Sequence, residues 1–259
     1  METDLISVTT HTDQEEVARI FSKYDFIALP VVDKEYRMVG IVTVDDAIDV
    51  ISEETEEDFA IMAAITPQEK PYIQSSALSI FLSRIPWLLI LMISATFTGI
   101  IISSFENALS VYVVLTSFIP MLMGTAGNSS SQSSVTVIRG LSLGEIDFRD
   151  ILRVQWKEIR ISIACGVTLA LANFLKLYYF DRLVLSNNDI TFEIAIIVSL
   201  TLFVTVILAK LVGCTLPIVA KKIGFDPAVM ASPFITTIVD ALSLIVFFKI
   251  ATLFLPITL

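Results

Sequence analysis

The residues most able to do chemistry lie where the sequence is most apolar. The polar stretch MGTAGNSSSQSSVTVIRG (123–140) follows the apolar run SVYVVLTSFIPML (110–122). It carries Asn128 and Gln132 one helical turn apart, which places both on one face of a helix. Lipid offers polar groups no water, so they must face protein or a wet cavity. The stretch therefore predicts a polar wall inside a membrane domain.

We also expect the helix to break within this segment. Pro120 removes a helix hydrogen bond, and Gly124 and Gly127 let the backbone open so that carbonyl oxygens point into a cavity. The alternative is that small Ser and Gly residues only allow helices to pack closely.

The segment DPAVMASPFITTIVDALSLIVFF (226–248) holds the one acidic residue that we expect deep in a span, Asp240. Thr236 and Ser232 precede it by four and eight residues and Ser243 follows it by three, so one helical face is polar. Asp240 is either protonated and hydrogen-bonded to a neighbouring helix or ionised and facing a cation.

The donor types near these residues restrict the choice of cation. The only histidine is His11, and neither cysteine lies beside the polar residues. Carboxylate, amide and backbone oxygens suit Mg²⁺, Ca²⁺ or Mn²⁺ better than Zn²⁺ or Cu²⁺. Cys165 and Cys214 lie in apolar segments without CxxC spacing and are expected to be small buried hydrophobes.

Composition indicates an integral membrane protein. Of 259 residues, 55% are hydrophobic, and the mean hydropathy is +0.79. A net charge of −10 argues against a nucleic-acid partner. Five apolar segments are each long enough to span a bilayer; they lie at about 80–104, 108–138, 158–180, 191–219 and 228–257.

The first 55 residues predict a small α/β unit. The predicted order is strand, helix, strand, strand, helix. The unit resembles a CBS domain through its stretch TDQEEVARIFSKYDFIALPVVDKEYRMVGIVTVDDAIDVI (12–51). CBS domains work in pairs, so we expect this to be the second of a pair in a longer protein. The predicted fold class is thus a mainly α-helical membrane protein, with five transmembrane helices over 81–259 behind this unit and a linker over 56–80.

The two membrane motifs, behind a CBS unit and an acidic linker, resemble the MgtE family of magnesium channels. The resemblance implies a homodimer in membrane lipids with one pore for Mg²⁺, and no enzymatic activity. It further implies that Asp240 holds the pore ion, aided by oxygens at Gly124, Gly127, Asn128 and Thr236. Ala126 and Ser130 replace two glycines of the family motif.

Acidic residues crowd into positions 45–58. Such a run is often only a solvated helix face. The resemblance instead implies that regulatory Mg²⁺ binds there and closes the pore through a plug helix matching residues 58–80. The implied regulatory ligands are Asp25, Asp46, Asp49, Glu54, Glu57 and Asp58. A CBS unit also makes an adenine nucleotide a candidate ligand.

Three other functions can be compared with these motifs. An intramembrane metalloprotease needs HExxH, which this sequence lacks. A CBS-bearing chloride channel would not place an aspartate in its pore. A Na⁺- or H⁺-coupled divalent cation exchanger stays open, because the same oxygen site could alternate its access.

The positive-inside rule predicts the topology. Arg84, the basic loop 139–160, Lys210, Lys221 and Lys222 are assigned to one side, which is then cytoplasmic. The N-terminus is therefore expected inside the cell (inner) membrane and the C-terminus outside.

Cysteine labelling tests this topology. In a background without the two native cysteines, single cysteines at positions 188 and 222 should react with an impermeant reagent from opposite sides of the membrane. Labelling of both positions from the same side would contradict the topology.

Overall fold

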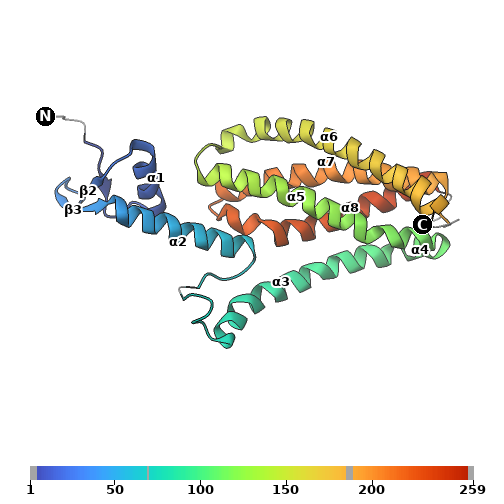
Figure 1. Cartoon of the computed structure of the whole chain (residues 1–259), viewed down its shortest axis with the longest axis horizontal. Helices are drawn as coiled ribbons and strands as arrows, with labels where there is room; N and C mark the ends of the chain where they lie inside the picture. Colours follow the sequence, from blue (N-terminus) through green and yellow to red (C-terminus); the bar gives the residue numbers. More distant parts are fainter. Residues whose placement is uncertain (1–4, 69, 185–188, 256–259) are drawn as a thin grey trace. The chain divides into compact units, whose positions relative to one another are not determined.

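The computed structural model describes residues 5–68, 70–184 and 189–255. The chain divides into two compact units, residues 1–60 and 61–259 (Figure 1). Position 188, proposed for labelling, lies outside the described residues. The first unit combines a small sheet with helices, and the second is helical.

The N-terminal unit has the order expected of its sequence. It contains β1 (Val8–Thr9), α1 (Gln14–Tyr24), β2 (Ala28–Val32) and β3 (Met38–Thr43), followed by α2 (Val44–Met62). β2 lies in the middle of the sheet, parallel to β1 and antiparallel to β3. The core cluster of the unit consists of Val8, Phe21, Leu29 and Ala47, so both helices pack on the sheet.

Local signals explain the limits of α1. The Asp13 carboxylate accepts a hydrogen bond from the Glu15 amide at 2.9 Å, which caps the helix start. The helix ends at Asp25, whose φ of 53° is left-handed. An aspartate tolerates this backbone conformation better than a bulky residue does.

The linker differs from the expected plug helix. α2 continues through the acidic run but ends at Met62, and the next helix, α3 (Ala77–Ser104), begins only at Ala77. Pro67 and Pro71 lie between them and lack the backbone N–H groups that a helix would need. A continuous helix over 58–80 is therefore not present.

The second unit is a helical bundle. After α3 come α4 (Glu106–Val111) and the short helix η1 (Val113–Phe118), then α5 (Ile119–Ser142). η2 (Phe148–Asp150), α6 (Ile151–Leu175) and the π-helical η3 (Lys176–Val184) follow. The chain closes with α7 (Phe192–Lys222), η4 (Pro227–Met230) and α8 (Ser232–Phe254).

Among the described residues, four helical stretches are long and apolar enough to cross a membrane. They are Ala77–Ser104, Phe148–Arg182, Phe192–Lys222 and Pro227–Phe254. α5 is long enough at 24 residues, but its serines, asparagine and glutamine make it too polar to qualify by composition. The fifth span stays a prediction.

The predicted helix break is displaced. α5 is continuous through Gly124 and Gly127, and Pro120 lies in its first turn, where no intrahelical N–H bond is lost. The irregular backbone precedes it, at η1. Opening of the helix at the glycines, as expected from the sequence, is therefore wrong.

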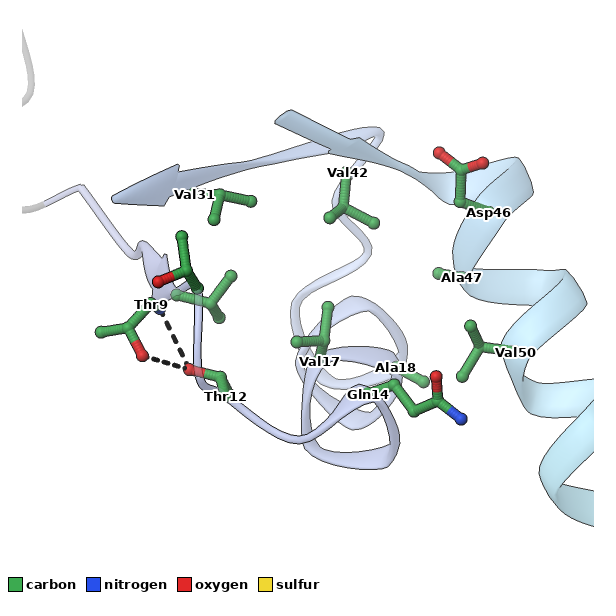
Figure 2. A pocket seen from close by; sticks show the side chains of 12 residues that line it. Thr9, Thr12, Gln14, Val17, Ala18, Val31, Val42, Asp46, Ala47 and Val50 are labelled. Atoms are coloured by element: carbon green, nitrogen blue, oxygen red, sulfur yellow. Dashed lines mark hydrogen bonds between the residues drawn. The ribbon is translucent and has the colours of Figure 1, made fainter. Parts of the chain in front are cut away.

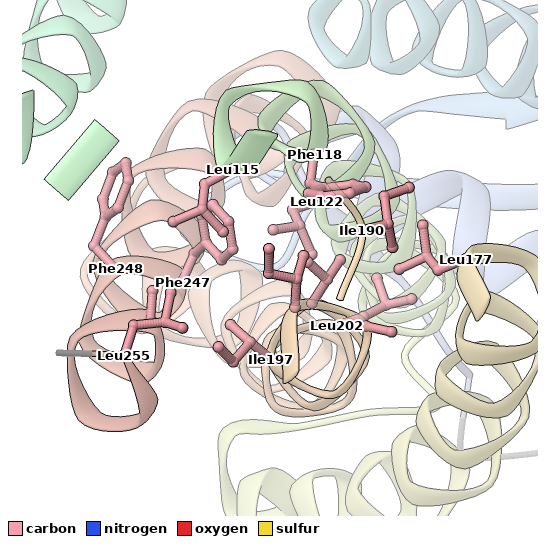
Figure 3. Close-up of a cluster of buried hydrophobic side chains, with 14 of the residues drawn as sticks. Leu115, Phe118, Leu122, Leu177, Ile190, Ile197, Leu202, Phe247, Phe248 and Leu255 are labelled. Atoms are coloured by element: carbon pink, nitrogen blue, oxygen red, sulfur yellow. The ribbon is translucent and has the colours of Figure 1, made fainter. Parts of the chain in front are cut away.

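Apolar side chains hold the bundle together at the end where α5 starts. Leu115, Leu122, Ile197 and Phe247 are all fully buried there in one cluster (Figure 3). They come from η1, α5, α7 and α8, so this cluster joins the polar helix α5 to its apolar neighbours. Figure 1 shows α6 and α8 running opposite to α5 and α7.

The far ends of α5 and α7 lie together, because Lys221 Nζ donates to the Leu141 carbonyl at 2.8 Å. The basic residues of the α5–α6 and α7–α8 connections therefore lie at the same end of the bundle. The positive-inside rule assigned them to one side of the membrane. Lys210 does not belong to that group. It lies inside α7 and is only 5% exposed.

α5 and α7 touch through their backbones. A Cβ added at Gly213 of α7 would lie 2.4 Å from the carbonyl oxygen of Ser130 in α5. Only glycine allows this approach, as is common between membrane helices. Gly213 therefore sets the distance between the polar helix and the most buried one.

Replacing Gly213 by alanine should force α5 and α7 apart. We expect a loss of about 1–3 kcal/mol of stability, since the obstructing atom belongs to the backbone. Gly99→Ala is the control, because a Cβ there has no atom within 4 Å. Thermal unfolding of the detergent-solubilised protein should separate the two variants; equal melting temperatures would contradict the contact.

Candidate cation site

Three of the predicted pore residues meet where α5 crosses α8. A Cβ added at Gly127 would lie 3.1 Å from Thr236 Cγ2 and 4.0 Å from Asp240 Oδ1. The absence of a side chain at Gly127 therefore leaves room for the Asp240 carboxylate beside the α5 backbone. Asp240 itself is half-buried in α8, so its carboxylate combines access with a protein wall.

The other two predicted residues lie on the outer face of α5. Gly124 and Asn128 are exposed, and so is Gln132 one turn further on. Asn128 and Gln132 thus share a face, as their spacing predicts. In a bilayer this polar face has to meet water or another protein surface.

The buried face of α5 is also polar, and most of its serine hydroxyls bond to backbone carbonyls. Ser129 Oγ donates to the Thr125 carbonyl at 2.8 Å, and Ser130 Oγ donates to the Gly127 carbonyl at 2.9 Å. Ser134 Oγ reaches the Met230 carbonyl at 3.2 Å and ties α5 to η4. These three serines are small packing residues whose hydroxyls have partners, whereas the buried Ser133 Oγ has no hydrogen-bond partner among the described residues.

On α8, two hydroxyls of the polar face that carries Asp240 bond to carbonyls of their own helix. Thr236 Oγ1 donates to the Pro233 carbonyl at 3.0 Å, and Ser243 Oγ donates to the Val239 carbonyl at 2.6 Å. Each hydroxyl oxygen retains acceptor capacity for a ligand. The side chain of Ser232 lies outside the described part of the structure.

One chain supplies few strong ligands at this site. Within the described residues, no group of three or more His, Cys, Asp or Glu side chains could hold a metal ion. Mg²⁺ gives up its water reluctantly and commonly uses one or two carboxylates with retained waters. The Asp240 site fits that pattern better than a dedicated cage of protein ligands.

The predicted regulatory acids are spread along the first unit. Asp46 Oδ2 accepts from Thr43 Oγ1 at 2.7 Å, and Glu54 Oε1 accepts from Gln14 Nε2 at 2.7 Å. Asp25, Asp49 and Glu57 are exposed, and Asp58 is half-buried. The structure does not bring these six residues together.

The charge state of one neighbouring acid follows from its surroundings. The pKa of the Asp45 carboxyl is lowered, chiefly by the nearby Thr43 hydroxyl, which also lies 2.7 Å from Asp46 Oδ2, and further by backbone amides at the start of α2. Asp45 is thus ionised at neutral pH and adds to the negative potential at the start of α2.

The first unit contains a cavity of about 360 Å³ between the sheet and both helices (Figure 2). Val17, Val31, Val42 and Val50 form apolar walls, and the Asp46 carboxylate lies at the edge. Among the described residues that line it there is no lysine or arginine. A nucleotide's phosphates would need cations from elsewhere, so the adenine-nucleotide expectation stays a prediction.

Comparison with known families agrees with both halves of the chain. The sequence profile of the MgtE family, described as a divalent cation transporter, matches residues 119–250. This chain belongs to the MgtE family. The CBS domain profile matches residues 1–53, which confirms the predicted character of the N-terminal unit.

Three curated relatives are each named "Magnesium transporter MgtE". The Thermus thermophilus relative is 36% identical over 98% of this chain and 55% of its own length. Those of Bacillus subtilis and Enterococcus faecalis are 39% and 32% identical, over 98% and 97% of this chain and 54% and 53% of their own lengths. The chain thus spans about half the length of these relatives, and their names describe transporters rather than enzymes.

Within this MgtE chain, sequence reasoning missed two charged residues. Asp240 is not the only carboxylate inside the bundle, because Glu158 of α6 is 9% exposed and lies 4.0 Å from Lys210. Lys210 is counted from sequence with the cytoplasmic charges, and Glu158, at the start of the segment 158–180, is given no role from sequence. The available signal was the position of Lys210, flanked on both sides by long apolar runs of one segment.

Proposed function

We propose that two copies of this chain form a pore that conducts Mg²⁺ across the cell membrane. The observation that carries the proposal is the meeting of Gly127, Thr236 and Asp240 beside an exposed polar face of α5. A polar face on a membrane helix is tolerated when it lines water or a partner. A second copy facing this surface would enclose it and supply a second Asp240.

The chemistry of the site favours a hydrated divalent cation. Two carboxylates across a dimer axis carry two negative charges, which one divalent ion balances and one monovalent ion does not. Mg²⁺ keeps several waters, so amide and backbone oxygens at Asn128 and Gly124 could bind it through its hydration shell. The family's description as divalent cation transporters supports this assignment.

The second part of the proposal is gating by cytoplasmic Mg²⁺. Like-charged carboxylates along α2 repel one another, and a divalent ion would let them approach other acidic surfaces. The non-helical linker after Met62 connects these acids to α3. Mg²⁺ held by the acids of α2 would then restrain the linker and close the pore.

Asp240→Asn tests the pore. The substitution keeps the side-chain shape and removes the charge, so Mg²⁺ flux into proteoliposomes should fall at least about tenfold while folding persists. Asp240→Glu should be partly active at best, because one extra methylene pushes the carboxylate into the pore. Glu145→Gln, which removes an exposed loop carboxylate, is the control and should leave flux unchanged.

Normal flux through well-folded Asp240→Asn protein would return Asp240 to a packing role. The same assay separates a channel from an exchanger. Channel flux should follow the Mg²⁺ gradient and voltage alone, whereas dependence on an imposed Na⁺ or H⁺ gradient would favour the coupled exchanger.

Limited proteolysis tests the gating. Millimolar Mg²⁺ should protect the linker over 63–76 from cleavage, and joint neutralisation of Asp45, Asp49, Glu54, Glu57 and Asp58 should abolish the protection. Neutralising the exposed Glu16 and Glu35 instead should leave the protection intact. Equal cleavage of the unmodified chain with and without Mg²⁺ would show that this chain alone has no such regulatory site.

A further inference from the structure

A charged pair is buried between α6 and α7. Glu158 is 9% exposed and Lys210 is 5% exposed. Lys210 Nζ lies 4.0 Å from Glu158 Oε2, and that oxygen has no hydrogen-bond partner among the described residues. Charged side chains inside a membrane domain are costly, and they are usually paired and functional.

Neutral contacts already hold α6 against α7 on both sides of this pair. Gln155 Nε2 donates to Thr215 Oγ1 at 2.9 Å, and Asn173 Nδ2 donates to Ser199 Oγ at 3.2 Å. Between them, Gly166 packs so closely on Phe203 that a Cβ would lie 2.9 Å from its ring. The two helices therefore have other means of docking, and two buried charges need a further explanation.

Lys210 lies at the depth of the candidate cation site. Ala126 of α5, Ala209 of α7 and Val239 of α8 belong to one buried cluster, so the three helices meet at this level. The next residues along the three helices are Gly127, Lys210 and Asp240. The backbone of Lys210 therefore lies at about the same level of the bundle as Asp240. Its side chain points away from that site, towards Glu158 on α6.

A positive charge at this depth would oppose a cation at Asp240. Packed helix axes are about 8–10 Å apart, and charges inside proteins interact with an effective dielectric constant of about 20. On that scale, a lone ammonium group one helix away would weaken the binding of a doubly charged ion by roughly a hundredfold to a thousandfold.

We propose that Glu158 neutralises Lys210 and so keeps the pore attractive to a divalent cation. In this role the pair affects the electrostatic potential at the cation site without contacting the ion. The inference rests on the proposed function, because it assigns these residues to the same Mg²⁺ pathway. This role can be told from a packing role. If the pair tunes the cation site, removing Glu158 and removing Lys210 should have different effects on Mg²⁺ flux, because they leave charges of opposite sign.

The test compares single and double variants of the full chain in proteoliposomes. Glu158→Gln leaves a lone lysine and should raise the Mg²⁺ concentration for half-maximal flux about tenfold or more. Lys210→Gln leaves a lone carboxylate and should leave that concentration unchanged or lower it. The neutral double variant and the exchanged pair, Glu158→Lys with Lys210→Glu, should both restore the wild-type value.

Two exposed positions supply matched controls, Glu193→Gln on α7 and Lys249→Gln on α8, and neither should change the half-maximal concentration. A packing role would instead make both single pair variants unstable, with similar effects on flux. The inference would be overturned if Glu158→Gln and Lys210→Gln both raised the half-maximal Mg²⁺ concentration, or if Glu158→Gln left it unchanged. Should Glu158→Gln fail to fold, a raised concentration for Lys210→Gln or for the exchanged pair would overturn it equally.

The outcomes also separate this inference from the proposed function. If wild-type protein carries no Mg²⁺ flux, the proposed function itself fails. If wild-type flux is normal and the Glu158 variants are indifferent to charge, only the role of the ion pair fails.

Discussion

Polar groups in a bilayer have no water to bond, and this constraint explains most of the second unit. On the inner face of α5, the hydroxyls of Ser129 and Ser130 satisfy this constraint by donating to carbonyls of their own helix. The same small residues leave room for a backbone contact with α7 at Gly213. The outer face, which carries Asn128, cannot be satisfied in this way. A polar surface therefore remains on one side of an otherwise apolar bundle.

The close packing of α5 is also what shapes the cation site. α5 lies against α7 through Gly213 and against α8 through Gly127. At the second contact, the missing side chain leaves the space in which the Asp240 carboxylate approaches α5. A glycine at one position thus serves packing and chemistry together, and the helix does not need to break there. The carbonyl of Gly127 stays in its helix and accepts the hydroxyl of Ser130.

Sequence patterns predicted the features that depend on local chemistry. The CBS order and the shared face of Asn128 and Gln132 follow from periodicity and spacing, and they agree with the structure. The position of Pro120 was ambiguous, since proline suits a first helical turn as well as a break. Pro120 lies in a first turn because η1 ends at Phe118 and α5 begins at Ile119. No local sequence pattern predicted η1 or this start of α5.

The buried pair was beyond local reasoning for another reason. Glu158 and Lys210 are 52 positions apart in the sequence, at the start of one apolar segment and inside another, and no local pattern pairs them. Only the packing of α6 on α7 brings them within 4.0 Å. Once paired they cancel, whereas Asp240, next to Val239 of the cluster with Ala126 and Ala209, has no salt-bridge partner among the described residues. Two facing copies would then present two negative charges to the pathway, which is the charge that a single divalent cation neutralises.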